Sequence, residues 1–297
     1  MLYIFTTNYI IEFLYNMKSI DLLKFQNMDI TLVEKEGKNL EKLGIEGKIN
    51  AHKLYTACIE NIPKEYSKGF AYMRGLMRFK IWNIEKFFGW NEKYFSQAGQ
   101  DKFIYDNFFK NKKNGYFIEI GAFDGIQGSN CLFFEKFKNW TGLAIEPSPT
   151  QFKKLKNNRK CKLINKAASS SSGKMTFIEV NTSESNSQLS GLEKHFSNKS
   201  KDILKKNNLK KYAVEVLSFE EILKNADQDI IDYCSIDIEG AEIPLIENFN
   251  FSNYKIKVLS IENNWSKTIK YDKILNKHGY SFFDSVGVDE IWVNNSF

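Results

Sequence analysis

The pattern of apolar positions changes character along the chain. In the first third, apolar side chains recur at helical spacing, most clearly over residues 66–88. From there onward, short apolar runs typical of strands alternate with segments typical of helices. The sequence therefore predicts a helical extension over residues 1–92 and an α/β domain over residues 93–297.

The α/β domain contains eight runs with the length and apolar character of strands. In chain order they are residues 116–120, 143–146, 162–165, 175–180, 232–238, 256–262, 280–286 and 290–293. A short Gly-Val-Asp segment joins the last two runs, which predicts a hairpin at the edge of a mostly parallel sheet. The long polar stretch 181–200 is loop-like and predicts a lid on the substrate side.

Composition and charge limit the possible partners. Hydrophobic residues make up 42% and charged residues 26% of the chain, which is ordinary for a globular protein. The net charge of +6 is too small to indicate nucleic-acid binding. The Lys-rich run 199–211 is interpreted as a solvated helix face. We therefore expect a small-molecule or glycan partner and no nucleic acid.

The cysteines and the N-terminal stretch bear on location. The four cysteines are far apart and form no CxxC pair, which argues against a disulfide framework or a structural zinc site. The apolar stretch Leu2–Leu14 is interrupted by Asn8 and Glu12, and it is shorter than the roughly 20 residues that span a bilayer. We expect a cytoplasmic protein that contacts membranes at most peripherally, through its N-terminus.

The turn Glu119–Gly125 follows the first strand of the α/β domain. Ligands of doubly wound sheets bind beyond the carboxyl ends of the strands, and Gly121 and Gly125 would let the backbone approach a ligand closely. The two glycines are four residues apart and no third follows, unlike the GxGxxG fingerprint of dinucleotide sites. Glu119 and Asp124 suit a ligand with positive groups, such as the sulfonium and ammonium of S-adenosylmethionine.

Two further strand ends extend this prediction. Glu146 stands at the tip of the second strand, where a carboxylate can accept both ribose hydroxyls of an adenosine group. The helix expected at 129–138 gives a suitable connection between the two strands. Ala168, after the third strand, would leave room for an adenine ring, although it is equally compatible with a packed core.

Carboxylates are concentrated where the strand 232–238 ends. Strand alternation would place Asp237 and Glu239 on one face, with Glu242 a turn further on and Glu262 at the tip of the next strand. Such a group could deprotonate a hydroxyl or hold Mg²⁺. The alternative is that Glu239 and Glu242 only favour the start of the next helix through its dipole.

In order, these segments resemble the FkbM-type S-adenosylmethionine-dependent methyltransferases over residues 95–294. The matching segments are Ser96–Asp101, Phe117–Gly125, Ser129–Asn130, Asn139–Pro147, Asp237–Glu242 and Ile261–Glu262. The resemblance implies a class I, Rossmann-like methyltransferase fold. It also implies O-methylation of a hydroxyl on a sugar, a glycan or a natural product.

The resemblance also implies roles for individual residues. Gly121, Asp124 and Gly125 would line the methionine end of the cofactor, and Glu146 would hold its ribose. Asp237 would face the methyl-transfer centre. Ser96–Asp101 would fold over the cofactor entrance, and the matched pair Ser129–Asn130 is included in the predicted cofactor site.

The predicted reaction is an in-line transfer of the methyl group to a hydroxyl oxygen, with Asp237, Glu239 or Glu262 taking the proton. His195 in the long loop is a weaker candidate for this base. The same three acids are the possible ligands of a metal ion. Two alternatives remain at this point: a nicotinamide-dependent oxidoreductase, and a non-catalytic module that retains the fold for interactions.

Overall fold

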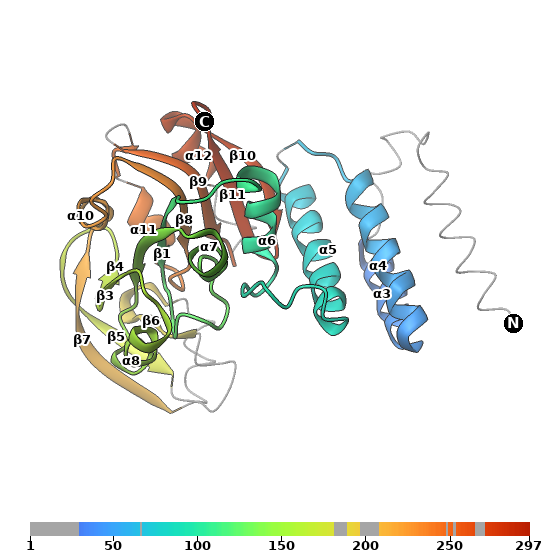
Figure 1. Cartoon of the computed structure of the whole chain (residues 1–297), viewed down its shortest axis with the longest axis horizontal. Helices are drawn as coiled ribbons and strands as arrows, with labels where there is room; N and C mark the ends of the chain where they lie inside the picture. Colours follow the sequence, from blue (N-terminus) through green and yellow to red (C-terminus); the bar gives the residue numbers. More distant parts are fainter. Residues whose placement is uncertain are drawn as a thin grey trace, which may run out of the picture. The chain divides into compact units, whose positions relative to one another are not determined.

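The structure, a computed structural model, describes residues 30–65, 67–180, 189–196, 208–247, 249–251, 254–264 and 271–297 (Figure 1). The chain divides into two compact units. One comprises residues up to Glu92 together with Asp284–Val288, and the other comprises Lys93–Phe283 together with Asp289–Phe297. The apolar stretch Leu2–Leu14 lies outside the described residues.

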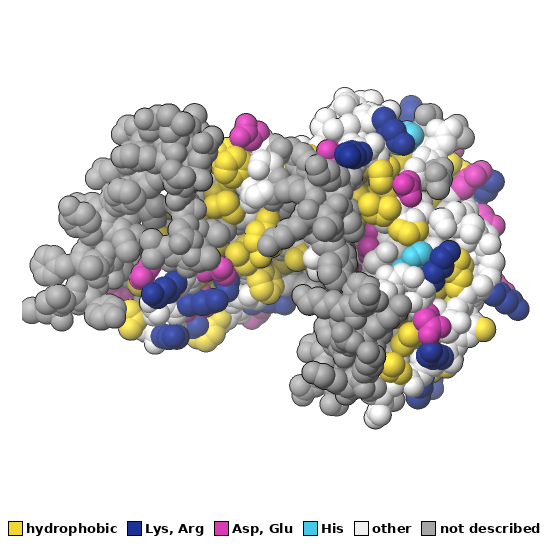
Figure 2. Space-filling view, turned by 180° about the vertical axis from the view of Figure 1, so that it is seen from behind, with side chains coloured by type: hydrophobic (Ala, Val, Ile, Leu, Met, Phe, Trp, Pro, Cys, Tyr) yellow, Lys and Arg dark blue, Asp and Glu magenta, His cyan; other side chains and the backbone are white. Residues whose placement is uncertain are grey.

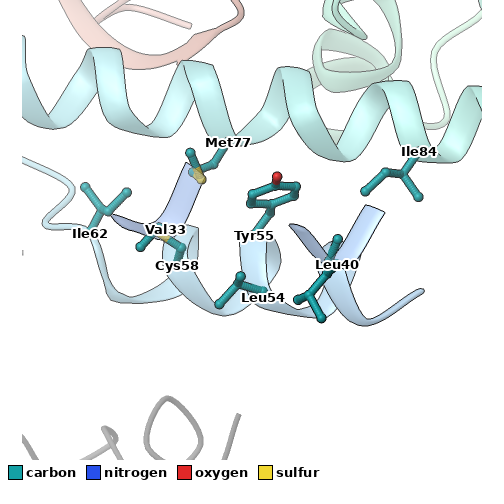
Figure 3. Close-up of a cluster of buried hydrophobic side chains, with 9 residues drawn as sticks. Val33, Leu40, Leu54, Tyr55, Cys58, Ile62, Met77 and Ile84 are labelled. Carbon is teal, nitrogen blue, oxygen red and sulfur yellow. The ribbon is translucent and has the colours of Figure 1, made fainter. Parts of the chain in front are cut away.

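Helices form the described part of the first unit, as the apolar spacing indicates. They are α3 (Ile30–Glu41), α4 (Gly44–Asn61) and α5 (Lys68–Phe87). Tyr55 and Cys58 on α4 pack with Met77 on α5 in a buried apolar core (Figure 3). None of the helices in the described residues combines the length and apolar character needed to cross a membrane.

Residues 284–288 belong to the helical unit because α5 binds them. Asp284 accepts hydrogen bonds from Arg74 Nε at 2.5 Å and from Arg78 Nη2 at 2.6 Å. The Gly287 amide donates to the Gly75 carbonyl at 3.2 Å. A Cβ atom at Gly75 would lie 2.2 Å from the Gly287 carbonyl oxygen, so a side chain at this position would disrupt the contact.

A seven-stranded sheet with the order β10-β11-β9-β8-β1-β2-β3 organises the second unit. Its strands are β1 (Tyr116–Ile120), β2 (Thr141–Ile145), β3 (Lys162–Ile164), β8 (Ile230–Ile236), β9 (Lys255–Glu262), β10 (Tyr280–Val286) and β11 (Asp289–Asn294). The strands from β9 to β3 are parallel, and β11 is antiparallel to β9. This confirms the predicted mostly parallel α/β sheet with antiparallel C-terminal strands.

Short helices accompany this sheet. They are α6 (Gln100–Ile104), α7 (Leu132–Lys138), α8 (Pro149–Asn158), α10 (Phe219–Lys224), α11 (Glu242–Ile246) and α12 (Asp272–Leu275), with the π-helical turn Tyr105–Phe109 and the 3-10 turns Glu193–His195 and Asn276–His278. The predicted helix 129–138 begins at Leu132, because Ser129 and Asn130 are occupied in the preceding turn. Buried aromatic rings of Phe134, Trp140 and Tyr233 pack together beside α7.

A second, four-stranded sheet has the order β4-β7-β5-β6. Its strands are β4 (Ala167–Ala168), β5 (Gly173–Val180), β6 (Gly191–Leu192) and β7 (Leu209–Leu217). The interpretation of 199–211 as a helix face is wrong for Leu209–Lys211, which begin β7; residues 199–207 lie outside the described part. The interpretation of 181–200 as a loop is wrong for Gly191–Leu192, which pair with β5. Residues 181–188 and 197–200 lie outside the part of the chain that the structure describes.

One face of the described residues carries side chains of both charges. On the face shown in Figure 2, Lys and Arg side chains are interspersed with acidic and apolar ones. This distribution agrees with the small net charge of +6.

Candidate functional site

Four parallel strands end level with one another at the carboxyl edge of the main sheet. Ile120 of β1 is in register with Ile145 of β2 and with Ile236 of β8. Ile236 is in turn in register with Ile261 of β9. The residues that follow these isoleucines form a line across the sheet, which we call the tip row: Glu146, Gly121, Asp237 and Glu262. The strand order reverses between β1 and β8, where ligands of such sheets bind.

Both glycines of the turn Glu119–Gly125 are required by contacts within the protein. Gly121 has φ of 90°, and a Cβ atom there would lie 1.8 Å from the carbonyl oxygen of Asp237. Gly125 has φ of 83°, and its Cβ would lie 2.6 Å from Leu155 Cδ1. The sequence attributes these glycines to the approach of a ligand, but the structure shows that neighbouring strands and helices already exclude side chains there.

Glu119 is buried beneath the turn and shapes it from inside. Its carboxylate forms an ion pair with Arg159 at 2.6 Å. It also accepts hydrogen bonds from the Ser129 hydroxyl and from the backbone amide of Asn130, both at 2.8 Å. These contacts fix the segment between β1 and α7, so Glu119 and Ser129 support the surface that a ligand would meet.

Asp124 organises the following loop. Its Oδ1 accepts from the backbone amides of Ile126 at 2.9 Å and Gln127 at 2.8 Å. Its backbone carbonyl accepts from the side-chain amide of Asn158 at 2.8 Å. These contacts fix the position of Asp124, and one of its two carboxylate oxygens is occupied by backbone hydrogen bonds.

Glu146 lies at the tip of β2 and is 5% exposed. Its two oxygens accept one backbone hydrogen bond each, from Phe123 at 2.9 Å and from Ser148 at 2.7 Å. Burial raises the pKa of Glu146 to about 8, although these hydrogen bonds oppose the rise. Because each oxygen retains a second lone pair, the carboxylate can accept two further hydrogen bonds from a ligand.

Asn130 provides an unsatisfied acceptor near β8. Its Nδ2 donates to the Ser235 hydroxyl at 2.9 Å. Its Oδ1 is buried and has no hydrogen-bond partner among the described residues. An unsatisfied buried carbonyl oxygen is costly, so Asn130 Oδ1 retains the capacity to accept a further hydrogen bond.

Ala168 lies in β4, buried and paired with Leu217 of β7. The main sheet ends its third strand at Ile164, so Ala168 belongs to the second sheet instead. The structure therefore places this predicted adenine contact in a separate strand.

The acids Asp237, Glu239 and Glu262 meet in one group, which we call the acid cluster. One carboxylate oxygen from each lies within 4.8 Å of those of the other two. The alternation argument for Asp237 and Glu239 is wrong, because β8 ends at Ile236 and neither residue is in a strand. A tight turn brings them together instead, with φ of 54° at Glu239 and 106° at Gly240.

Burial and mutual repulsion disfavour full ionisation of the acid cluster. Burial raises the pKa of Asp237, and the nearby Asp289 charge raises it further. Burial raises the pKa of Glu239 and of Glu262, and the charge of Asp237 adds to both shifts. Three close carboxylates are stable only if they share protons or bind a cation, so this group is poised to exchange protons near neutral pH or to hold a metal ion.

Glu242 supports the turn that carries Glu239. It is buried at the start of α11 and accepts from the amides of Ile238 at 3.0 Å and of Gly240 at 3.0 Å. Glu242 is the first residue of α11, but the amides it binds, those of Ile238 and Gly240, precede that helix and belong to the turn. The alternative in which the acids serve only the following helix does not fit Glu239, whose oxygen lies with those of Asp237 and Glu262.

The segment Ser96–Asp101 lies between the loop after the glycine turn and the residues beside the acid cluster. Ser96 forms a parallel bridge with Gly128, in the loop that follows the glycine turn. Asp101 is buried and accepts from the Ser96 hydroxyl at 2.6 Å; burial raises its pKa to about 6. Gln100 hydrogen-bonds to Asp289, beside the acid cluster.

Sequence reasoning missed Asp289 because only strand register reveals its position. Asp289 lies opposite Glu262 in the β9–β11 ladder and accepts from the Ser260 hydroxyl at 2.9 Å. The weaker candidate His195 has its Nε2 3.0 Å from the Ser169 hydroxyl, a contact that the sequence does not predict. Neither residue occurs in a motif, so the sequence contains no local signal for either.

The comparisons with known proteins now bear on this geometry. Residues 119–282 match the family described as "Methyltransferase FkbM domain". The chain belongs to the FkbM methyltransferase family. The match spans the glycine turn, Glu146 and the acid cluster. No curated protein matches the sequence.

The solved structures that the chain matches are only distantly similar to it. The FkbM methyltransferase from Methylobacillus flagellatus KT shares 10% identity with a TM-score of 0.44; the match covers 82% of this chain and 59% of that one. The N-terminal domain of human METTL16 in complex with SAH shares 12% identity with a TM-score of 0.33, covering 93% and 97% of the two chains. The present chain therefore spans less than two thirds of the length of the Methylobacillus flagellatus protein.

Family membership bears on the choice between the two enzyme classes considered from the sequence. Membership of the FkbM methyltransferase family favours methyl transfer over the oxidoreductase alternative. Glu146 and the unsatisfied Oδ1 of Asn130 have chemistry that fits S-adenosylmethionine, since this cofactor carries ribose hydroxyls and an ammonium group.

Proposed function

We propose that this FkbM methyltransferase transfers the methyl group of S-adenosylmethionine to a hydroxyl oxygen of a sugar, a glycan or a natural product. The tip row carries the proposal, because it puts an adenosine-type acceptor (Glu146) and a group of potential bases (Asp237 and Glu262) at two sides of Gly121. A donor held at one side would direct its reactive end toward the other.

The donor side is assigned from free hydrogen-bonding capacity. We assign Glu146 to the two ribose hydroxyls and Asn130 Oδ1 to the ammonium group. Gly121, Asp124 and Gly125 would border the methionine end, and Ala168 the adenine. Glu119 and Ser129, both committed to contacts inside the protein, would act by holding the turn in place.

When bound, the cofactor supplies a methyl group already activated on a positive sulfur. The protein then has to hold the acceptor oxygen in line and remove its proton. We assign proton removal to the acid cluster, with Asp237 foremost because it stands next to Gly121 in the tip row. Its raised pKa suits a group that takes a proton near neutral pH.

The acid cluster would also accommodate a divalent cation such as Mg²⁺. Its donors are hard carboxylate oxygens, which Mg²⁺ prefers, and they lie close enough together to share one ion. A cation there would remove the repulsion among the carboxylates and would lower the pKa of a coordinated hydroxyl.

We place the protein in the cytoplasm. The four cysteines are free in the structure, three of them buried, as expected for a reducing compartment.

A methyl-transfer assay with a panel of hydroxyl-bearing sugars and labelled S-adenosylmethionine tests this function. We expect label in an ether linkage on one class of acceptor. Asp237→Asn should lower kcat by about 10²- to 10⁴-fold, because the proton acceptor is lost, while SAH affinity changes less than about threefold. Transfer to nitrogen or carbon, or full activity in Asp237→Asn, would overturn the proposal.

A further inference from the structure

The turn that carries Glu239 is enclosed by a segment from another part of the chain. This segment, Leu189–Phe196, includes β6 and the 3-10 turn Glu193–His195. A Cβ atom at Gly191 would lie 3.2 Å from Glu239 Cβ. A Cβ atom at Gly240 would lie 2.9 Å from the carbonyl oxygen of His195. The segment therefore packs directly against both central residues of the turn.

The Glu239–Gly240 turn needs such external support. Glu239 has φ of 54°, a left-handed conformation that costs free energy for a residue with a side chain. The buried carboxylate of Glu242 supports the turn from one side through the amides of Ile238 and Gly240. The contacts of Gly191 and His195 supply backbone packing from another element.

The segment itself is held in two ways. Leu192 is buried and pairs with Phe177 of β5, and the Ser190 hydroxyl accepts from the Val180 amide at 3.0 Å. At its other end, His195 Nε2 forms a hydrogen bond of 3.0 Å with the Ser169 hydroxyl. Phe196 at the same end packs with Ile178 and Val180, and Glu193 forms an ion pair with Lys211. Among these residues, His195 is the one whose carbonyl oxygen faces Gly240, so its side-chain bond acts directly on that contact.

Ser169 is rigidly placed. Its side chain is fully buried, it follows Ala168 of β4 directly, and its amide donates to the Leu217 carbonyl at 3.1 Å. The hydrogen bond between His195 and Ser169 therefore joins the segment to the residue directly after β4 of the second sheet. A buried partner such as Ser169 restrains the position of His195, whereas a side chain exposed on the surface would restrain it less.

We propose that Ser169 and His195 are positioning residues for the acid cluster. Their hydrogen bond holds the His195 backbone against Gly240, and this contact keeps Glu239 beside Asp237 and Glu262. Its importance for catalysis rests on the proposed function, in which the acid cluster removes the proton of the acceptor. Ser169 and His195 lie outside the tip row and would set the position of one member of that cluster.

Hydrogen exchange tests the proposal without an acceptor substrate. In Ser169→Ala and in His195→Ala, we expect the amides of Ile238 and Gly240 to exchange at least about fivefold faster than in the wild type. Ser169→Thr retains the hydroxyl and should restore slow exchange. Ser172→Ala is the matched control, because it removes a nearby hydroxyl that accepts from the Ser218 amide and does not contact His195.

The double variant separates one shared contact from two independent ones. If the hydrogen bond is the link, Ser169→Ala with His195→Ala should accelerate exchange no more than either single change. Unchanged exchange in both single variants, or accelerations that multiply in the double variant, would overturn the proposal. Calorimetry with SAH is read separately: a wild-type protein without SAH affinity would contradict the proposed function but not this structural link.

Discussion

At the scale of single residues, Glu146 combines deep burial with only two hydrogen bonds to its carboxyl group. Burial raises its pKa from an ordinary value of 4.5 to about 8. The folded protein therefore holds this proton more tightly than the unfolded chain does. The resulting stabilisation is complete below about pH 4.5 and is lost as the pH rises through about 8.

The ligand-free wild type should accordingly lose more free energy of unfolding between about pH 6 and about pH 9 than Glu146→Gln, which has no proton to lose there. Denaturant unfolding at several pH values measures this difference. Equal slopes for the two proteins would show that Glu146 titrates normally in the folded state.

Gly121 is the second residue whose role is set by a single contact. Replacement by Ala would put Cβ at 1.8 Å from the Asp237 carbonyl and would strain a backbone with φ of 90°. We expect Gly121→Ala to lower the free energy of unfolding by about 2 kcal/mol or more.

Gly69→Ala is the control for this change. Gly69 lies in helix α5 with only Ser67 Oγ, at 3.8 Å, near its Cβ position, so Ala should be neutral or stabilising. Chemical denaturation of both variants provides the measurement. A Gly121→Ala protein as stable as Gly69→Ala would mean that β1 and β8 do not approach as closely as described.

At the scale of elements, the sequence predicts the main sheet well because its strands have strong signals. Buried parallel strands such as β1 and β8 are continuous apolar runs, and the C-terminal hairpin has a clear turn. The second sheet could not be predicted in full. β4 and β6 have two residues each, and β7 begins with Leu209-Lys210-Lys211, whose charges resemble an exposed helix.

The site shows the same division. Its acids could be found because carboxylates follow directly after apolar strands. The sequence also groups Asp237, Glu239 and Glu262, but not for the reason that holds in the structure, where strand register and the left-handed conformation of Glu239 bring them together. The ion pair that occupies Glu119 inside the protein is made with Arg159, which is 40 residues away in the chain. Nothing near Glu119 in the sequence indicates this partner.

The acid cluster at the carboxyl ends of β8 and β9 leads to a prediction about metal ions. If the acid cluster binds Mg²⁺, dialysis against EDTA should lower methyl transfer at least about tenfold, and added Mg²⁺ should restore it. Glu262→Gln should weaken the Mg²⁺ response without a comparable loss of SAH affinity. Undiminished turnover after EDTA treatment would instead leave shared protons as the means by which the cluster limits its charge.

At the scale of the whole molecule, the chemistry lies in the second unit. The family match at residues 119–282, the tip row and the acid cluster all fall within it. The described residues of the helical unit form their own buried core. They include helices α3 to α5 and the segment Asp284–Val288, which α5 binds through Arg74 and Arg78.

The central claim is that Glu146 holds the adenosine part of the methyl donor. Titration calorimetry of wild type and Glu146→Ala with SAH tests it most directly, with Asp237→Asn as the control that should keep its affinity. We predict that SAH binds the wild type and that Glu146→Ala weakens binding at least about tenfold, a loss of about 1.4 kcal/mol, because the ribose hydroxyls lose their hydrogen-bond partner. Unchanged SAH affinity in Glu146→Ala would contradict the account.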